Sequence, residues 1–275
     1  MKVIKQSAHI VKDWPKMNLY ERCEFAGRIS HASEDKIKEG SAGDFVRRIV
    51  KLGHESVFEF ARIKSCLSIE TGTYNYKENL RTVRAHCKKY LEHNNSNYLK
   101  EYLHALSLSR LYPAFFSDIE SDYFRDDDHG VTYERDDEWI PVLIITNRAI
   151  SHQLVRYRKD VVYLQQSQRY VKYDDIEFID PEVYFDESNP DKMWQIWEDE
   201  MYRAAKYYEY CLTQGYSAQA ARLFLPNSTA TKLIMYASPD TWRHVFEQRI
   251  SDKADPMIRE LLEPLKEEFV KERLL

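Results

Sequence analysis

The hydrophobic and polar positions along the chain follow two periods, one typical of strands and the other of helices. Segment 60–70 alternates apolar and polar residues as a half-buried strand does, and segment 2–15 also indicates a strand. The apolar run 141–146 predicts a buried strand that leads into a helix ending near residue 158. Helical periodicity or capping signals mark the segments 18–30, 42–54, 77–110, 190–215, 217–226, 238–253 and 255–275. The chain therefore predicts a mixed fold whose last third is helical, with an acidic surface loop over 124–139.

Composition narrows the class of protein. With 275 residues and 43% hydrophobic content, the chain can bury a full core, and no run approaches the roughly 18 apolar residues of a membrane helix. The first residues lack the apolar region of a signal peptide, so we expect a cytoplasmic protein without membrane contact. The seven glycines form neither GxGxxG nor a P-loop, and the four cysteines lack CxxC spacing, so we expect no metal site. A net charge of −5 gives no general attraction to nucleic acid, so any anion site has to be local.

Two predicted C-terminal helices carry an arginine on the face that should be apolar. Arg222 follows Ala218 at helical spacing, and Arg249 follows Trp242 in the same way. An unpaired buried charge is expensive, so each arginine needs an anionic partner or a polar cleft. For either helix alone, a side chain that reaches solvent or an internal salt bridge is the simpler explanation. Two such helices, together with the segment described next, favour an anion site.

The segment 156–170, RYRKDVVYLQQSQRY, concentrates cationic, amide and aromatic side chains directly after the predicted strand and helix. It contains four Arg or Lys, three Gln and three Tyr residues within fifteen positions. Gln153 and Arg156 lie three residues apart on one helix face, while 167–169 follow in an irregular or extended segment. Guanidinium groups suit a phosphate and an amide suits a pyrimidine edge, so the segment indicates a nucleotide site. Binding of single-stranded nucleic acid by stacking is an alternative at this point.

The same segment resembles the signature of the flavin-dependent thymidylate synthases, which is Arg-His-Arg, seven residues, Ser and a closing Arg-Tyr. Here 156–158 is Arg-Tyr-Arg, eight residues follow, and 167–170 is Ser-Gln-Arg-Tyr, so Tyr replaces His and one residue is added. Other blocks resemble that family in the same order: RIS at 28–30, GHESVFE at 53–59, ARLFLP at 221–226 and the helix that ends in Arg249. Several ordered matches are more specific than one.

This resemblance implies a tetrameric α+β enzyme in which helices flank a twisted mixed or antiparallel sheet. It covers residues 20–70 and 140–260, so we expect a single domain over 1–275 with a largely helical insertion at 71–139. It also implies active sites shared between subunits, with FAD and NADPH as cofactors and dUMP and 5,10-methylenetetrahydrofolate as substrates. The insertion contains His86, Cys87 and His93, which match no common metal spacing and are expected to be packing residues.

Site residues carry over from the family by position. Flavin contacts fall at Ser30, His54, Ser56, Glu59, Arg156, Tyr157, Arg158, Ser238 and His244, of which the last two stand where relatives have asparagine. Nucleotide contacts fall at Gln153, Gln165, Ser167, Gln168, Arg169, Arg222 and Arg249, and Gln165 stands where the family usually has glutamate. The catalytic candidates are Arg249, which would stabilise charge on the pyrimidine ring, and Ser167, which would contact phosphate or ring rather than act as a nucleophile. Arg169 is the candidate for binding phosphate.

The chemistry explains why these groups are needed. Methylation of uracil C5 requires that this carbon become nucleophilic, and ordinary thymidylate synthases achieve this with a cysteine. None of the four cysteines lies in the blocks that resemble nucleotide-binding segments, whereas in the flavin-dependent family reduced flavin supplies hydride. We therefore expect reductive methylation of dUMP to dTMP. Two alternatives stay open: a hydroxymethylase that uses the same flavin, folate and nucleotide, and a non-catalytic protein that binds nucleotides or single strands.

Overall fold

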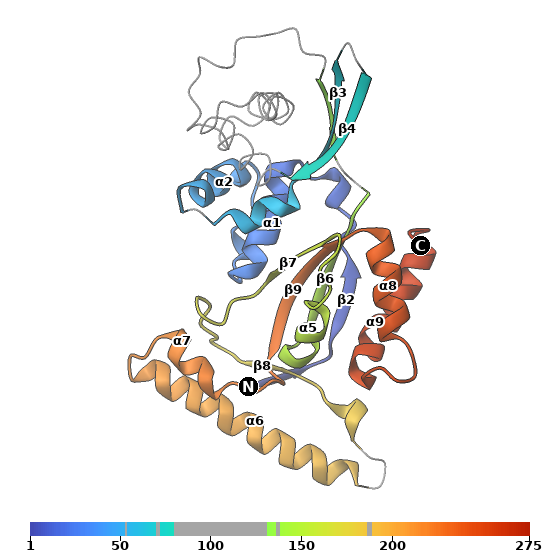
Figure 1. Cartoon of the computed structure of the whole chain (residues 1–275). Helices are drawn as coiled ribbons and strands as arrows, with labels where there is room; N and C mark the ends of the chain where they lie inside the picture. Colours follow the sequence, from blue (N-terminus) through green and yellow to red (C-terminus); the bar gives the residue numbers. More distant parts are fainter. Residues whose placement is uncertain (53, 70–71, 80–130, 136–137, 186–188) are drawn as a thin grey trace. The chain divides into compact units, whose positions relative to one another are not determined.

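The computed structural model describes residues 1–52, 54–69, 72–79, 131–135, 138–185 and 189–275 (Figure 1). The chain divides into two compact units. The first contains residues 1–12, 29–33 and 139–275, and the second contains residues 13–28 and 34–138. All seven predicted nucleotide contacts therefore belong to the first unit.

The first unit is built on a four-stranded antiparallel sheet with the strand order β2-β6-β9-β7 (Figure 1). Its strands are β2 (Ser7–Ile10), β6 (Ile140–Asn147), β9 (Ala230–Ala237) and β7 (Val161–Gln165). In the central pair, Val142 lies opposite Met235 and Ile144 lies opposite Leu233, and all four residues are fully buried. Burial of these side chains on one face fixes the register of the two strands, because a shift by one residue would turn the buried side chains to the other face.

Three helices cover that face of the sheet: α5 (Arg148–Leu154), α8 (Pro239–Arg249) and α9 (Pro256–Lys271). The fully buried rings of Trp242 in α8 and Phe269 in α9 pack with centroids 5.2 Å apart. Trp242 Nε1 donates to the carbonyl of Ile140 in β6 at 3.1 Å, so the one polar atom of this side chain is satisfied inside the core. The core therefore ties the C-terminal helices to the strand that precedes α5.

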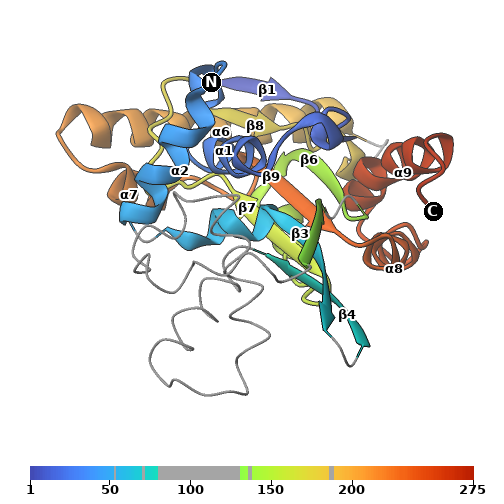
Figure 2. The same ribbon diagram turned by 90° about the horizontal axis from the view of Figure 1, so that it is seen from above.

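A second hydrophobic cluster of the same unit lies beside the short parallel pair β1 (Lys2–Ile4) and β8 (Glu177–Ile179). Phe178 of β8 and Tyr208 of α6 (Pro190–Thr213) are both fully buried in it. The helix α7 (Ala218–Ala221) and the 3₁₀ turns η7 (Glu182–Tyr184) and η8 (Arg222–Phe224) complete this end of the unit. With 24 residues, α6 is the longest helix that the structure describes (Figures 1 and 2), and α7 lies beside its C-terminal end (Figure 1).

The second unit contains helices and a separate sheet with the order β4-β3-β5. Its elements are η1 (Trp14–Lys16), α1 (Leu19–Ser30), η2 (Glu34–Lys36), α2 (Ser41–Leu52), η3 (Glu55–Phe60), β3 (Arg62–Ile69), β4 (Gly72–Asn79) and β5 (Val131–Arg135). The last two residues of α1 belong to the first unit. Helices α1 and α2 approach closely at Gly27, where a Cβ atom would collide with the ring of Phe45.

Most predicted elements are confirmed, including the mixed fold with sheets flanked by helices, and four local predictions are wrong. Residues 77–79 are in β4 instead of a helix, and β5 lies inside the segment predicted to be an acidic loop. β9 interrupts the C-terminal third that was predicted to be helical. The helix predicted over 217–226 ends at Ala221, so Arg222 stands in a 3₁₀ turn and does not continue an α-helical stripe.

Other expectations fall outside the described residues. Most of the insertion 71–139 is among them, and so are His86, Cys87 and His93. Among the helices that the structure describes, none combines the length and apolar character needed to cross a membrane. No group of three or more potential metal ligands gathers within the described part of the chain.

Candidate functional site

The predicted nucleotide site is organised by α5, which begins where β6 ends. Asn147 is the N-cap residue of this helix, because its Oδ1 accepts from the amide of Ile150 at 2.8 Å. Ile150 and Leu154 face the core and are fully buried. Gln153, one position before Leu154, is half-buried and lies at the C-terminal end of the helix. A buried strand followed by a capped, one-sided helix therefore places this amide at the edge of the core.

Arg249 reaches the same place from the end of α8. Its Nε donates to the hydroxyl of Tyr157 at 3.1 Å, Nη1 donates to Gln153 Oε1 at 3.2 Å, and Nη2 donates to the Gln153 carbonyl at 3.5 Å. All three acceptors are neutral oxygens. Among the described residues, no carboxylate forms an ion pair with Arg249. The structure thus unites three predicted site residues and leaves the positive charge without an internal counterion.

Tyr157 occupies the position at which the family signature has histidine. Its ring meets the ring of His244 edge-on with centroids 5.7 Å apart, and the guanidinium of Arg249 lies 5.7 Å from its centroid. The carbonyl of Tyr157 lies 3.4 Å from the hydroxyl of Tyr163, which also donates to the Leu154 carbonyl at 2.9 Å. Tyr157, one predicted flavin contact, therefore touches both His244, another predicted flavin contact, and the predicted catalytic arginine.

The segment after β7 forms a turn in which the predicted phosphate contacts follow one another. The amide of Ser167 donates to the carbonyl of Ser30 at 2.9 Å, and the Ser167 hydroxyl accepts from the amide of Arg169 at 3.2 Å. Arg169 is exposed, and its Nε donates to Gln219 Oε1 at 3.0 Å. The Ser167 hydroxyl therefore stabilises the turn, which presents the remaining N–H groups of Arg169 to solvent.

A second cationic group lies next to this turn. Arg148, at the start of α5, is half-buried, and burial lowers the pKa of its guanidinium, which the like charge of Arg222 lowers further. Neither arginine has an ion pair with a described carboxylate. Two guanidinium groups held close together without a counterion are suited to bind an anion. The sequence prediction included Arg222 and missed Arg148, because Arg148 begins a helix and breaks no apolar stripe.

Gln168 and Tyr173 carry buried polar atoms at the same end of the unit. Gln168 lies close enough to the Tyr173 hydroxyl to oppose the rise in its pKa, but the two groups do not reach hydrogen-bond geometry. The Gln168 Nε2 and the Tyr173 hydroxyl are therefore buried without a hydrogen-bond partner among the described residues. Burial is the main reason that the pKa of Tyr173 rises to about 12. A buried N–H without an acceptor favours a ligand with oxygen acceptors at this position.

Gln165 has a defined hydrogen-bonding role in place of the usual glutamate. Its Nε2 donates to Ser151 Oγ at 2.9 Å and to Thr231 Oγ1 at 3.2 Å. A carboxylate at this position could not donate either bond. The amide thus ties β7 to α5 and β9.

The other predicted site residues lie at three places in the structure. Arg156 and Arg158 are exposed and have no ion pair with a described residue, so both are free to bind phosphate oxygens. Ser238 is the N-cap residue of α8, since its Oγ accepts from the amide of Thr241 at 3.2 Å. A further group, in or beside η3, belongs to the second unit: His54, Ser56 and Glu59.

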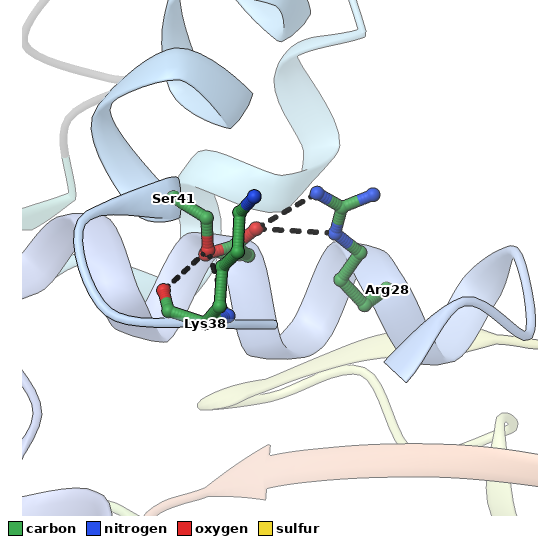
Figure 3. Close-up of polar contacts among 4 residues, drawn as sticks. Arg28, Lys38 and Ser41 are labelled. Atoms are coloured by element: carbon green, nitrogen blue, oxygen red, sulfur yellow. Dashed lines mark hydrogen bonds and ion pairs between the residues drawn. The ribbon is translucent and has the colours of Figure 1, made fainter. Parts of the chain in front are cut away.

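The second unit also contains a cavity of about 560 Å³ between α1 and α2, and none of the predicted site residues lines it. Its wall includes Glu24, which is 2% exposed and accepts from Arg28 Nη2 at 2.9 Å (Figure 3). The hydroxyl of Ser41 lies 2.7 Å from both Glu24 Oε2 and the Lys38 carbonyl. The buried carboxylate is thus satisfied by the chain itself, so these contacts stabilise the packing of α1 and α2 without a ligand.

Comparison with known proteins gives matches over the same part of the chain. The family model for thymidylate synthase complementing protein matches residues 140–273, the segment that holds Gln153, Tyr157 and Arg249. The chain is thus similar to the thymidylate synthase complementing protein family over residues 140–273. The match includes every predicted nucleotide contact and leaves out Ser30 and the residues of η3, so the resemblance of the N-terminal blocks stays a prediction.

Relatives of this family match over the same part of the chain. A flavin-dependent thymidylate synthase of Geobacter sulfurreducens is 38% identical over 116 residues, which are 42% of this chain and 49% of the relative. Another, of Pyrococcus furiosus, is 30% identical over 126 residues, or 46% and 51% of the two chains. The chain thus spans about half the length of the curated relatives it matches. Among solved structures, the UMP/dUMP methylase PolB of Streptomyces cacaoi is 14% identical with a TM-score of 0.47, over 98% of this chain and 93% of that one.

Proposed function

We propose that this protein is a flavin-dependent thymidylate synthase. It would convert dUMP to dTMP by reductive methylation, with 5,10-methylenetetrahydrofolate as carbon donor, NADPH as reductant and FAD as cofactor. The observation that carries this proposal is the placement of Arg249. Its uncompensated guanidinium is held by Gln153 and Tyr157, inside the segment that matches the family.

Arg249 is suited to stabilise negative charge on the pyrimidine ring. A guanidinium has five N–H donors, and three of those of Arg249 are used by Tyr157 and Gln153. Two donors, one on each terminal nitrogen, are left for the nucleotide. Because neighbouring side chains hold the group in place, it needs no reorganisation as charge develops on the ring.

The phosphate of dUMP would bind at the other cationic group. Arg222 and Arg148 supply positive charge, Gln168 supplies a buried N–H, and Arg169 lies in the adjacent turn. This arrangement offers charge-assisted hydrogen bonds to several phosphate oxygens at once. Ser167 would orient the turn, and its amide and hydroxyl are already used within the chain.

The donors available for FAD suit an anionic dinucleotide. Arg156 and Arg158 are exposed cations without ion pairs to described residues, and they can bind pyrophosphate oxygens. The ring of Tyr157 and the imidazole of His244 provide an aromatic edge beside them. Bound FAD would supply the hydride, and the residues of this chain would bind and orient it. Ser30, Ser238, His54, Ser56 and Glu59 complete the proposed flavin contacts.

The two cysteines whose side chains the structure describes, Cys23 and Cys211, are consistent with a mechanism that uses no cysteine nucleophile. Cys23 is fully buried, and burial raises the pKa of its thiol well above the usual range, so the reactive thiolate is not formed near neutral pH. Cys211 lies on α6, in the cluster around Tyr208. Neither is hydrogen-bonded to a residue of the proposed nucleotide site.

We also propose a homotetramer with active sites shared between subunits, located in the cytoplasm. The first unit exposes large apolar side chains on α6 and η8, including Tyr210, which is 62% exposed, and Leu223, which is 82% exposed. Contact with another copy would remove this surface from water.

The test uses the purified full chain. We expect a yellow protein whose flavin absorbance bleaches on addition of NADPH without oxygen. When dUMP and 5,10-methylenetetrahydrofolate are added with deuterated reduced flavin, mass spectrometry should detect deuterium in dTMP. A colourless protein that cannot be reconstituted with FAD contradicts the proposal and favours a non-catalytic nucleotide-binding protein.

A hydroxymethylase on the same scaffold is the second candidate. It is favoured by the altered signature, in which Tyr157 replaces histidine and its hydroxyl is bonded to Arg249. Formation of 5-hydroxymethyl-dUMP as the sole product would establish this alternative.

A further inference from the structure

Asp255 is the N-cap residue of α9, and its carboxylate also holds two other segments. Oδ1 accepts from the amide of Met257 at 3.0 Å and from the hydroxyl of Tyr184 in η7. Oδ2 accepts from Nε2 of Gln153 in α5 at 3.0 Å. One side chain therefore joins three elements that are distant in the sequence, and one of its partners is a proposed nucleotide contact.

The amide of Gln153 lies between a group that only accepts and a group that only donates. The carboxylate of Asp255 can accept, and the guanidinium of Arg249 can donate. Both are satisfied only when Nε2 faces Asp255, at 3.0 Å, and Oε1 faces Arg249, at 3.2 Å. A reversed amide would place N–H against N–H on one side and oxygen against oxygen on the other. Asp255 thus selects one of the two amide orientations.

The orientation of the amide in turn limits the position of Arg249. Gln153 Oε1 and the Gln153 carbonyl accept from the two terminal nitrogens, while Tyr157 accepts from Nε. The guanidinium is planar, so three fixed acceptors set both its plane and the directions of its two unused N–H groups.

We propose that Asp255 is a positioning residue for the nucleotide site. It fixes the amide of Gln153 and, through it, the guanidinium of Arg249, while Tyr184 holds the carboxylate in place. The nature of the ligand, dUMP, rests on the proposed function, whereas the hydrogen-bond chain does not. Asp255 needs no contact with the nucleotide for this role.

The decisive variant is Asp255→Asn. Asparagine caps helices as well as aspartate does, so α9 should stay intact, with the side-chain oxygen accepting from Met257 and Tyr184. The new NH₂ group then faces Gln153 Nε2, donor against donor. Isothermal titration calorimetry of the full chain should show dUMP binding at least about 10-fold weaker than in the wild type. The thermal unfolding midpoint should stay within a few degrees.

The double variant Asp255→Asn with Gln153→Glu again pairs each hydrogen-bond donor at this position with an acceptor. The asparagine NH₂ can donate to one oxygen of the new carboxylate, and Arg249 can donate to the other. We expect the crystal structure of this protein to show Arg249 back in its wild-type position, whereas dUMP affinity stays low because the new carboxylate gives Arg249 a counterion. The matched control is Asp252→Asn, an exposed residue in the same α8–α9 connection, which should bind dUMP as the wild type does.

Crystal structures without nucleotide test the chain independently of the ligand. In Asp255→Asn, the Gln153 amide should be reversed or Arg249 should have moved from Gln153 Oε1. If Gln153 and Arg249 keep their wild-type positions, or if dUMP affinity is unchanged, the positioning role is wrong. A lower midpoint, together with an Arg249 position that Gln153→Glu does not restore, would also overturn it in favour of a purely structural role. Failure of the wild type to bind dUMP would instead contradict the proposed function, and the crystal structures would still decide the positioning role.

Discussion

The guanidinium of Arg249 has a different environment from that of Arg243, the other arginine of α8. Arg243, six residues earlier, is exposed and forms an ion pair with Asp240. Arg249 is half-buried, and its partners are the neutral oxygens of Tyr157 and Gln153. A partly desolvated cation without a counterion attracts an anionic ligand more strongly than a surface cation does. This difference favours Arg249 over Arg243 as the candidate site residue of the helix.

Arg249→Lys tests this difference. Lysine keeps the charge but lacks the planar set of donors, so it cannot satisfy Tyr157 and Gln153 together and still present two N–H groups. We expect dTMP formation to fall by about 100-fold while the flavin content of the purified protein changes little. The control Arg243→Lys, on the exposed face of α8, should keep wild-type turnover. Equal turnover of Arg249→Lys and the wild type would contradict the proposed role.

Because the hydroxyl of Tyr173 is buried, we expect the free energy of unfolding to depend on pH. Burial raises its pKa from 10.0 to about 12, so the folded state retains the proton that the unfolded state releases first. Its contribution to the free energy of unfolding is complete below pH 10 and is lost as the pH rises from about 10 to about 12. In Tyr173→Phe, the loss of free energy of unfolding between pH 8 and pH 12 should be smaller than in the wild type by about 2 kcal/mol. Urea unfolding at several pH values in this range measures the difference. The exposed substitution Tyr216→Phe is the control and should leave the decline unchanged.

At the scale of elements, helix caps determine where the site residues stand. Asn147, Ser217, Ser238 and Asp255 each accept from a backbone amide in the first turn of the helix that follows. Each cap fixes the first residue of its helix and hence which later side chains face the site. Ser238 also shows that a position taken as a ligand contact can have a structural role. The asparagine found there in relatives is an equally good cap.

The Ser238 cap leads to a pair of matched substitutions. Ser238→Asn keeps an oxygen that can accept from the Thr241 amide, so the free energy of unfolding should change by less than about 0.5 kcal/mol. Ser238→Ala leaves that amide without a partner and should cost about 1 kcal/mol. Chemical unfolding of both variants gives the difference. If Ser238→Ala also lowers FAD affinity and Ser238→Asn does not, the cap and the proposed flavin contact act through the same oxygen.

At the scale of the whole molecule, the largest exposed side chains are unevenly distributed. Several lie on α6 and η8 of the first unit, where Tyr207 and Phe224 pack with ring centroids 5.6 Å apart and are both about half exposed. Leu223 beside them is 82% exposed. Monomeric proteins rarely leave a contiguous apolar surface of this kind in water. The surface supports the proposed assembly of several copies.

Leu223→Glu should weaken that assembly. A carboxylate at the centre of the apolar surface would have to be desolvated on association, which is costly without a partner. Light scattering coupled to size exclusion should detect smaller particles than in the wild type. Val270→Glu, an equally drastic change at an exposed position on α9, is the control and should leave the mass unchanged. Identical masses for the wild type and Leu223→Glu would argue against an interface at η8.

Regular patterns explain which elements could be predicted from the sequence. The run that became β6 is apolar and short, and α5, α8 and α9 each begin with a capping residue. β9 was missed because Leu233, Ile234 and Met235 are all fully buried, so the strand lacks the alternation that marks a half-buried one. β5 was missed because charged residues at 134–135 made it look like a surface loop.

The sequence by itself determined the chemical groups of the site and their order along the chain. The resemblance to a known family and the arginine in the apolar stripe of α8 predicted Gln153, Tyr157, Ser167 and Arg249 as site residues before any contact was known. Only the tertiary structure decided which of these groups meet, because Gln153 and Arg249 are 96 residues apart and their hydrogen bond depends on how α5 and α8 pack on one sheet. For the same reason Asp255 left no local signal. A capping aspartate gives the same sequence pattern whether or not it has a second hydrogen-bond partner. Only folding brings Asp255 to the Gln153 amide that it orients.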